Sequence, residues 1–194
     1  WSDRTDSGPS PDEPRAPADD DLFEIRSRLH GLDGATPALS EGQVGVPRAQ
    51  QMWDHWPLIR TFLAHLGLQA GLSVPTSAAS IQRGIALSRA EQCMPVKVAL
   101  AHCEDLLERG AGALFVPSLG EYPYDPTLEE SEMDRLLNCI YTIQLGSVVR
   151  ATLGERARQS RTPILVPSIS LNPELEGYTV RSLARALAPL ADLP

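Results

Sequence analysis

The sequence predicts an α/β fold: a Rossmann-like parallel sheet with helices on both faces. Short apolar runs at 44–46, 114–116 and 164–166 are each ended by a proline. Segments with apolar residues at helical spacing separate these runs. Strands that are buried on both faces have this composition, and their alternation with helices is typical of βαβ units. We therefore expect the three runs to be parallel neighbours in one sheet.

The N-terminal part of the chain predicts little packed structure. Residues 1–21 are rich in Pro, Asp and Ser and contain almost nothing apolar, which predicts a disordered linker. Residues 22–42 are expected to form a short helix, closed by Gly31, and then a loop. Because the chain starts at Trp1 rather than Met, we expect it to be part of a longer protein.

Residues 43–194 are predicted to form the Rossmann-like domain. After the strand at 44–46, apolar spacing predicts a helix over 51–66, which can begin near Trp56 because Pro57 lies in its first turns. A strand at 68–74 follows and is ended by Pro75. Thr76 or Ser77 is then expected to cap the next helix, because hydroxyl side chains bond to free N–H groups there.

The second half of the domain continues the alternation. Pro95 opens a helix that Gly110 stops, and the central strand at 113–116 ends at Pro117. Residues 118–134 are expected to form a long acidic loop, and 139–143 a short strand. We expect the remaining elements to be a helix from 145 to about 160, the strand at 164–166 and a helix over 179–190.

Composition excludes several classes of partner. The net charge is −8 and the basic residues are scattered, so we expect no nucleic-acid partner, since phosphate contacts need clustered Lys and Arg. No apolar run approaches the ~20 residues of a membrane span, so no membrane partner is expected. There is no secretory signal pattern, and three cysteines are too few for a disulfide framework. A reducing, cytoplasmic location is therefore predicted.

The three cysteines differ in their expected surroundings. Cys93 lies just before the helix opened by Pro95, where free N–H groups favour a thiolate; it is a metal ligand or a small core residue. Cys139 lies in a connection after the central strand and has the same two interpretations. Cys103 is about 15 Å further along the helix than Cys93 and is interpreted as a packing residue. We expect the sulfur atoms of Cys93 and Cys139 to approach each other.

Other candidate residues lie where ligands bind in such folds, beyond the carboxyl ends of the strands. Arg48 directly follows the first strand and could hold a phosphate or carboxylate, a surface salt bridge being the alternative. His55 and His65 are expected to bond to carbonyl groups. The chain contains no CxxC, HExxH, GxSxG, Walker A or GxGxxG motif.

Several segments in the same order resemble a known family. Residues 43–76 resemble its opening I-G-I-P-R-A-L stretch, and residues 91–97 its E-x-C-x-P-x-K segment. Residues 101–110 resemble the A-H-G-H-x-x-D-L-L-E-K-G helix, residues 114–117 the next strand, and Asn138-Cys139 the N-C-P motif. The chain is thus similar to the 2-hydroxyglutaryl-CoA dehydratase D-component-like domain and to CoA-substrate-specific enzyme activases.

The resemblance implies an iron–sulfur component. It implies a [4Fe–4S] cluster held by Cys93 and Cys139, electron transfer from an ATP-dependent activator, and an acyl-CoA substrate of the 2-hydroxyacyl-CoA dehydratase type. Family members often have a cysteine where Ser118 stands, so Ser118, with Arg48, is a candidate cofactor-binding residue. One alternative is a catalytic subunit that holds acyl-CoA at the strand ends. Another is an interaction or regulatory module that keeps the fold without the cluster.

Overall fold

The computed structural model describes residues 21–32, 39–122 and 137–190. The chain divides into two compact units, residues 1–35 and 36–194. In the first unit, α1 (Leu22–Leu29) is the predicted short helix, and Gly31 follows it with a φ of +66°. The predicted linker, apart from residue 21, and residues 123–134 of the predicted acidic loop lie outside the described residues.

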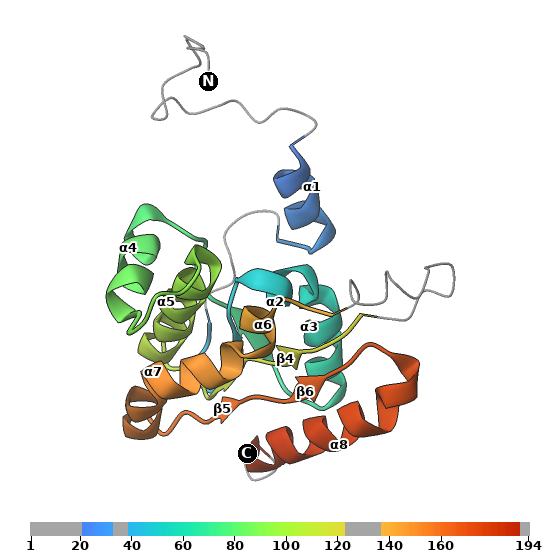
Figure 1. Ribbon diagram of the computed structural model, residues 1–194. Helices are drawn as coiled ribbons and strands as arrows, with labels where there is room; N and C mark the ends of the chain where they lie inside the picture. The colour runs from blue at the N-terminus through green and yellow to red at the C-terminus, as the bar shows by residue number, and fades with distance from the viewer. Residues whose placement is uncertain (1–20, 33–38, 123–136, 191–194) are drawn as a thin grey trace. The chain divides into compact units, whose positions relative to one another are not determined.

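The second unit contains a four-stranded parallel sheet (Figure 1). Its strands are β1 (Val44–Val46), β2 (Ala70–Leu72), β3 (Ala113–Phe115) and β5 (Ile164–Leu165), in the order β2-β1-β3-β5. β1 pairs in parallel with β3, and β3 with β5, so the predicted neighbours are confirmed. The fold is α/β and Rossmann-like.

Helices cover both faces of this sheet. The chain passes from β1 to β2 through α2 (Gln50–Asp54) and α3 (Trp56–His65), and returns past β1 to β3 through α4 (Ala78–Leu87) and α5 (Met94–Glu108). The crossover connection from β1 to β2 runs toward one edge of the sheet, and the connection from β2 to β3 runs toward the other edge. Because such crossovers are right-handed, α2 and α3 lie on one face and α4 and α5 on the other. α7 (Leu145–Gln159) packs beside α5.

The core is built from the apolar strand residues and the helix faces above them. Strand residues Val46, Leu114 and Phe115 are at most 1% exposed. A buried glutamate ties the helices of one face together: Glu104 of α5 forms ion pairs with Arg83 of α4 and Arg156 of α7. A carboxylate buried in this way needs such partners, because an unpaired buried charge is costly.

The predicted helix over 51–66 is two helices, α2 and α3, which meet at His55. Pro57 explains the break, because proline has no N–H for the helical bond and its ring clashes with the preceding turn. At the next helix the prediction is confirmed. The Ser77 hydroxyl accepts the backbone N–H of Ser80 at the start of α4, and the Ser80 hydroxyl lies 2.8 Å from the Ser77 nitrogen.

The prediction that prolines end the central and last strands is wrong in one respect. The strands pause at Pro117 and Pro167 and resume as β4 (Ser118–Leu119) and β6 (Ser168–Ile169), which pair in parallel in the register of β3 and β5. Pro167 has no N–H to donate to the carbonyl of Val116, so the ladder is interrupted for one step only. Ser118 is therefore a strand residue, and the carboxyl ends lie at Gly120 and Leu171.

Residues 139–143, predicted as a strand, form a short helix instead. α6 (Ile140–Ile143) begins after Cys139, whose carbonyl accepts the N–H groups of Thr142 and Ile143. A short apolar run is compatible with either structure. Here the run pairs with no described strand, and α7 follows directly after Gln144.

The last described elements are η2 (Pro173–Leu175), α8 (Glu176–Leu187) and η3 (Ala188–Leu190). α8 covers the outer edge of β6, because the Ser182 and Thr179 side chains accept the backbone N–H groups of Ser168 and Ser170 at 2.7 and 3.0 Å. No helix in the described ranges is long and apolar enough to cross a membrane.

Candidate functional site

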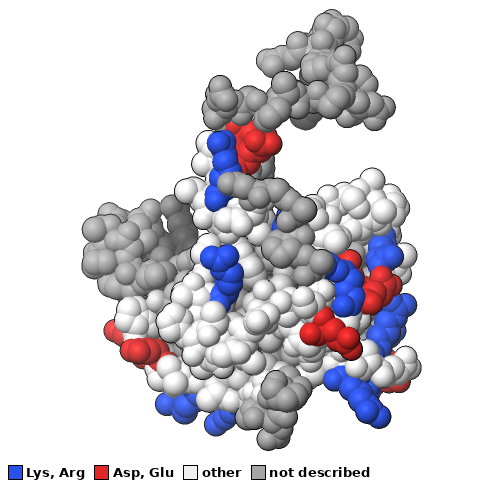
Figure 2. All heavy atoms as spheres, turned by 180° about the vertical axis from the view of Figure 1, so that it is seen from behind, with Lys and Arg blue, Asp and Glu red and all other residues white. Residues whose placement is uncertain are grey.

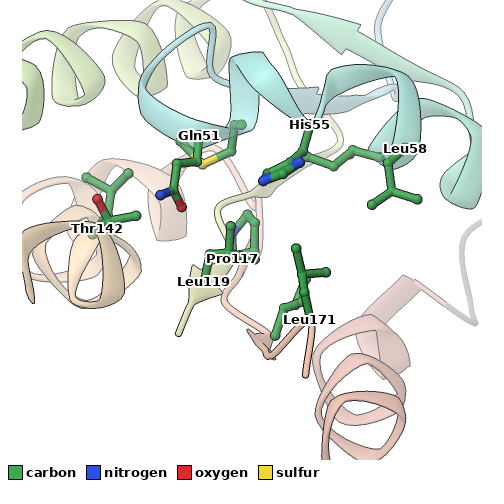
Figure 3. Close-up of a pocket in the computed structure, with 11 residues that line it drawn as sticks. Gln51, His55, Leu58, Pro117, Leu119, Thr142 and Leu171 are labelled. Carbon is green, nitrogen blue, oxygen red and sulfur yellow. The ribbon is translucent and has the colours of Figure 1, made fainter. Parts of the chain in front are cut away.

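An apolar pocket lies where the strand order reverses, between the connections that follow β1 and β3. Its cavity volume is about 40 Å³. Leu58 lines it from α3, Leu119 from β4 and Leu171 from the segment after β6 (Figure 3). Met52, Ile59 and Pro117 also belong to the lining. Open parallel sheets bind their ligands at this position. We call this cavity the switch-point pocket.

Three polar side chains, those of Gln51, His55 and Thr142, enter the otherwise apolar lining. Gln51 lies in α2 and His55 directly after it, four residues apart, and both point toward the cavity in Figure 3. The Oε1 atom of Gln51 and the Nε2 atom of His55 are buried and have no hydrogen-bond partner in the described residues. A buried polar atom without a partner costs about 1–3 kcal/mol. A ligand that supplies the partners would remove this cost.

Asn138 fixes the Gln51 amide in place. The Gln51 amide nitrogen donates to the Asn138 side-chain oxygen, and the Asn138 amide donates to the carbonyl of Leu119 at 3.0 Å. The backbone N–H of Asn138 also donates to Gly120 at 3.0 Å. Since its Nε2 is engaged, Gln51 presents its oxygen as the acceptor that remains for a ligand.

A second polar site at the same edge is fully bonded. The Ser73 hydroxyl lies 2.9 Å from Nδ1 of the buried His102, and the Thr76 hydroxyl lies 2.9 Å from its Nε2. Burial lowers the pKa of His102 to about 4; Asp105 opposes this effect and Arg48 adds to it. The imidazole is therefore neutral near pH 7. We call these three residues the Ser73–His102–Thr76 cluster.

Arg48 lies at the carboxyl end of β1, as predicted from its place in the sequence. Its backbone N–H donates to the Ser73 hydroxyl at 2.8 Å, and its guanidinium carbon lies 4.5 Å from the centre of a Trp53 ring. Burial lowers the pKa of Arg48 from its ordinary value. Its role in holding an anion stays a prediction.

The packing role predicted for Cys103 is confirmed, and the alternative that Cys93 and Cys139 are small core residues is wrong. Cys93 and Cys139 are exposed, and each lies directly before the first residue of a helix, α5 and α6 respectively. α5 leads into β3 and therefore runs from the carboxyl edge of the sheet toward its amino edge. Cys103 is completely buried in the middle of α5, and burial raises its pKa to about 12. That the sulfur atoms of Cys93 and Cys139 approach each other remains a prediction.

The cysteines of this chain do not make a complete cluster site. A [4Fe–4S] cluster usually takes four cysteine ligands, whereas the chain has three cysteines and buries one of them as a thiol. Within residues 21–32, 39–122 and 137–190, no three His, Cys, Asp or Glu side chains are grouped to hold a metal ion. Ser118 is half-buried in β4, and its backbone N–H donates to Pro167 at 2.8 Å.

The sequence did not reveal the pocket residues Gln51 and His55. His65 bonds to a carbonyl, that of Thr61 at 2.8 Å, as predicted, but the same prediction is wrong for the Nε2 atom of His55. The sequence nevertheless contained one indication of these two pocket residues. Residues 51 and 55 share a helix face directly after a strand of a predicted Rossmann-like sheet, which is where ligands bind.

On the face shown in Figure 2, the charged side chains that the structure describes form no second candidate ligand site as well defined as the switch-point pocket. Basic and acidic side chains lie close together along one flank of that face, and uncharged surface covers much of the remainder. Mixed charges of this kind partly neutralise each other. The described structure is therefore a Rossmann-like α/β domain whose clearest ligand cavity is the switch-point pocket.

A known family matches this domain. The model described as CoA enzyme activase uncharacterised domain (DUF2229) matches residues 43–190, which is more than half of the chain. The chain belongs to this family, and its resemblance to CoA-substrate activases is confirmed at that level. No curated protein and no solved structure is found to match the chain.

Proposed function

We propose that the domain is an acyl-CoA-binding component of an acyl-CoA dehydratase-type system, served by an ATP-dependent activator, and that the switch-point pocket holds the acyl group. One observation carries the proposal: the pocket has a mostly apolar lining, and two of its polar atoms, one acceptor and one ring nitrogen, are buried without partners. Small-molecule sites have this character, an apolar lining with a few placed polar groups. Membership of a CoA enzyme activase family supports a CoA ester as the ligand.

The two polar atoms fit the polar end of an acyl group. His55 can donate from Nε2 to the thioester carbonyl when its other ring nitrogen is unprotonated. Gln51 can accept a hydrogen bond through Oε1, because Asn138 holds its amide nitrogen. The apolar lining then receives the hydrocarbon part, with about 0.8 kcal/mol for each buried methylene group.

Calorimetric titration with free CoA and with acetyl-, butyryl- and hexanoyl-CoA tests the proposal. We expect free CoA to bind most weakly and affinity to rise two- to fourfold per added methylene until the pocket is filled. Leu171→Trp, which fills the pocket, should remove this dependence on acyl length. The matched control is Leu68→Trp, a half-buried leucine near the amino end of β2. Equal affinity for all four compounds would contradict the proposal.

A second candidate function follows from the exposed thiols. Cys93 and Cys139 would supply two ligands of a [4Fe–4S] cluster whose other ligands come from another chain. The supporting observation is that both lie at helix starts while the third cysteine is buried. Iron and acid-labile sulfide, measured after anaerobic reconstitution with the activator present, should fall in Cys93→Ser and Cys139→Ser and persist in Cys103→Ala. Absence of both elements from the parent protein would contradict this candidate.

A further inference from the structure

The outer edge of β5 is open at Ile164, whereas α8 covers the outer edge of β6. The backbone N–H groups of Leu114, Val116, Ser118 and Gly120 donate to the carbonyls of residues 163, 165, 167 and 169. Backbone groups alternate in direction along a strand, so the N–H and C=O groups of the even-numbered residues face the outer side. α8 covers this side at Ser168 and Ser170. At Ile164, no described strand lies beside β5.

A groove lined by arginines runs along this uncovered stretch. Arg150, Arg158 and Arg161 line it together with residues 162–164, and its volume is about 460 Å³. No acidic residue lines it, although the chain as a whole carries a net charge of −8. Glu155 pairs with Arg158 from outside the lining. We call this feature the edge groove.

Two further details set the chemistry of the edge groove. Arg150 donates to the outward carbonyl of Ile164 at 2.9 Å, so the outward N–H of Ile164 is the group that remains for a partner. Arg161 follows α7 with a φ of +57°, at the position where the N–H of Thr162 returns to the carbonyl of Ala157. Glycine is the usual residue there, because a side chain in this conformation is strained. An arginine at this place adds charge to the groove at a cost in stability.

We propose that the edge groove binds an extended acidic peptide segment of a partner protein, which adds to the sheet beside β5. The peptide backbone pairs with the N–H of Ile164, and its carboxylates face Arg158 and Arg161. Strand addition at an open edge is a known mode of peptide recognition, with main-chain bonds for affinity and side chains for specificity. This site lies at the amino end of β5 and is independent of the acyl-CoA proposal.

Fluorescence anisotropy tests it with a labelled, end-capped octapeptide that alternates Glu and Val. We expect saturable binding that weakens as salt is added, because exposed charges are screened. A Lys/Val octapeptide should bind at least tenfold more weakly, and so should a Glu/Val peptide N-methylated at alternate residues. Amide exchange at Ile164 should slow on binding. Equal binding of the N-methylated peptide, or of inorganic polyphosphate, would overturn strand addition.

Variants locate the site. The double variant Arg158→Gln/Arg161→Gln should weaken peptide binding at least tenfold, whereas Arg181→Gln/Arg185→Gln, two exposed arginines of α8, should leave it unchanged. Arg161→Gly should raise the Tm and still weaken binding, which separates loss of the site from loss of the fold. Equal weakening by both double variants would show that only general charge matters and would overturn the proposal.

Discussion

Two polar sites lie at the carboxyl edge of the sheet, and they differ in whether their buried polar atoms have hydrogen-bond partners. In the Ser73–His102–Thr76 cluster, both ring nitrogens of a buried histidine have hydroxyl partners. In the switch-point pocket, His55 and Gln51 each bury an atom without one. The first site links β2, α5 and the turn after β1. The comparison shows that, of the two sites, only the switch-point pocket combines a cavity with buried polar atoms that are left for a ligand.

Removal of each histidine is the strongest test of this comparison. His102→Ala should lower the free energy of unfolding by about 2–4 kcal/mol, because it opens a cavity and leaves two hydroxyl groups without partners. His55→Ala should cost less than about 1 kcal/mol, because its Nε2 has no bond to lose. Urea unfolding followed by circular dichroism measures both values. Equal losses would remove the distinction between the two sites.

The pH dependence of stability tests the bonded site alone. The pKa of His102 is about 4 in the folded protein, against about 6.5 in an unfolded chain. The unfolded state therefore binds the additional proton between these values, so stability falls as pH decreases from 6.5 toward 4. The difference corresponds to about 3 kcal/mol. Burial is the main cause of the lowered pKa of His102; Asp105 opposes this lowering and Arg48 adds to it.

Chemical unfolding at several pH values, compared with His102→Gln, checks this prediction. The variant removes the titrating ring and should flatten the decrease between pH 6.5 and 4, whatever its effect on stability at pH 7. If the free energy of unfolding of His102→Gln fell with pH as steeply as that of the parent protein, groups other than His102 would cause the decrease.

At the pocket, a smaller effect of opposite sign is expected. His55→Phe replaces a buried, unbonded ring nitrogen with carbon and keeps a ring of similar size near Tyr122, whose ring centre lies 6.3 Å away. We expect the free energy of unfolding to stay constant or to rise by up to about 1 kcal/mol. Affinity for butyryl-CoA should fall about tenfold at the same time. A clear loss of stability would place His55 among the structural residues.

The sheet was predictable because its strands carry their own signals. The runs at 44–46, 114–116 and 164–166 are buried and apolar, and parallel strands of this kind need helices between them. The prolines after two of these runs misled the prediction of strand ends. Pro117 and Pro167 interrupt hydrogen bonding for one step, but pairing resumes because the backbone direction is unchanged.

The candidate site was less predictable, because it depends on contacts between distant segments. Asn138 lies 87 positions from the glutamine that it orients, and no local pattern at Gln51 indicates this bond. The same holds for His102, whose partners Ser73 and Thr76 lie in another segment. The burial of Cys103, by contrast, followed from its helical position alone.

The backbone at Gln50 joins the two compared sites and gives the smallest predicted effect. Gln50 lies between Arg48, whose N–H bonds to Ser73, and Gln51 in the pocket, and its φ is +49°. A residue with a side chain is strained in this conformation, whereas glycine adopts it readily. We expect Gln50→Gly to be about 1 kcal/mol more stable than Gln50→Ala, since both remove the buried, unpartnered Oε1 and only glycine relieves the backbone. Equilibrium unfolding of the two variants measures this difference. If Gln50→Ala were the more stable variant, the left-handed conformation would not be a source of strain, and the turn would be held at no cost by the bonded site beside it.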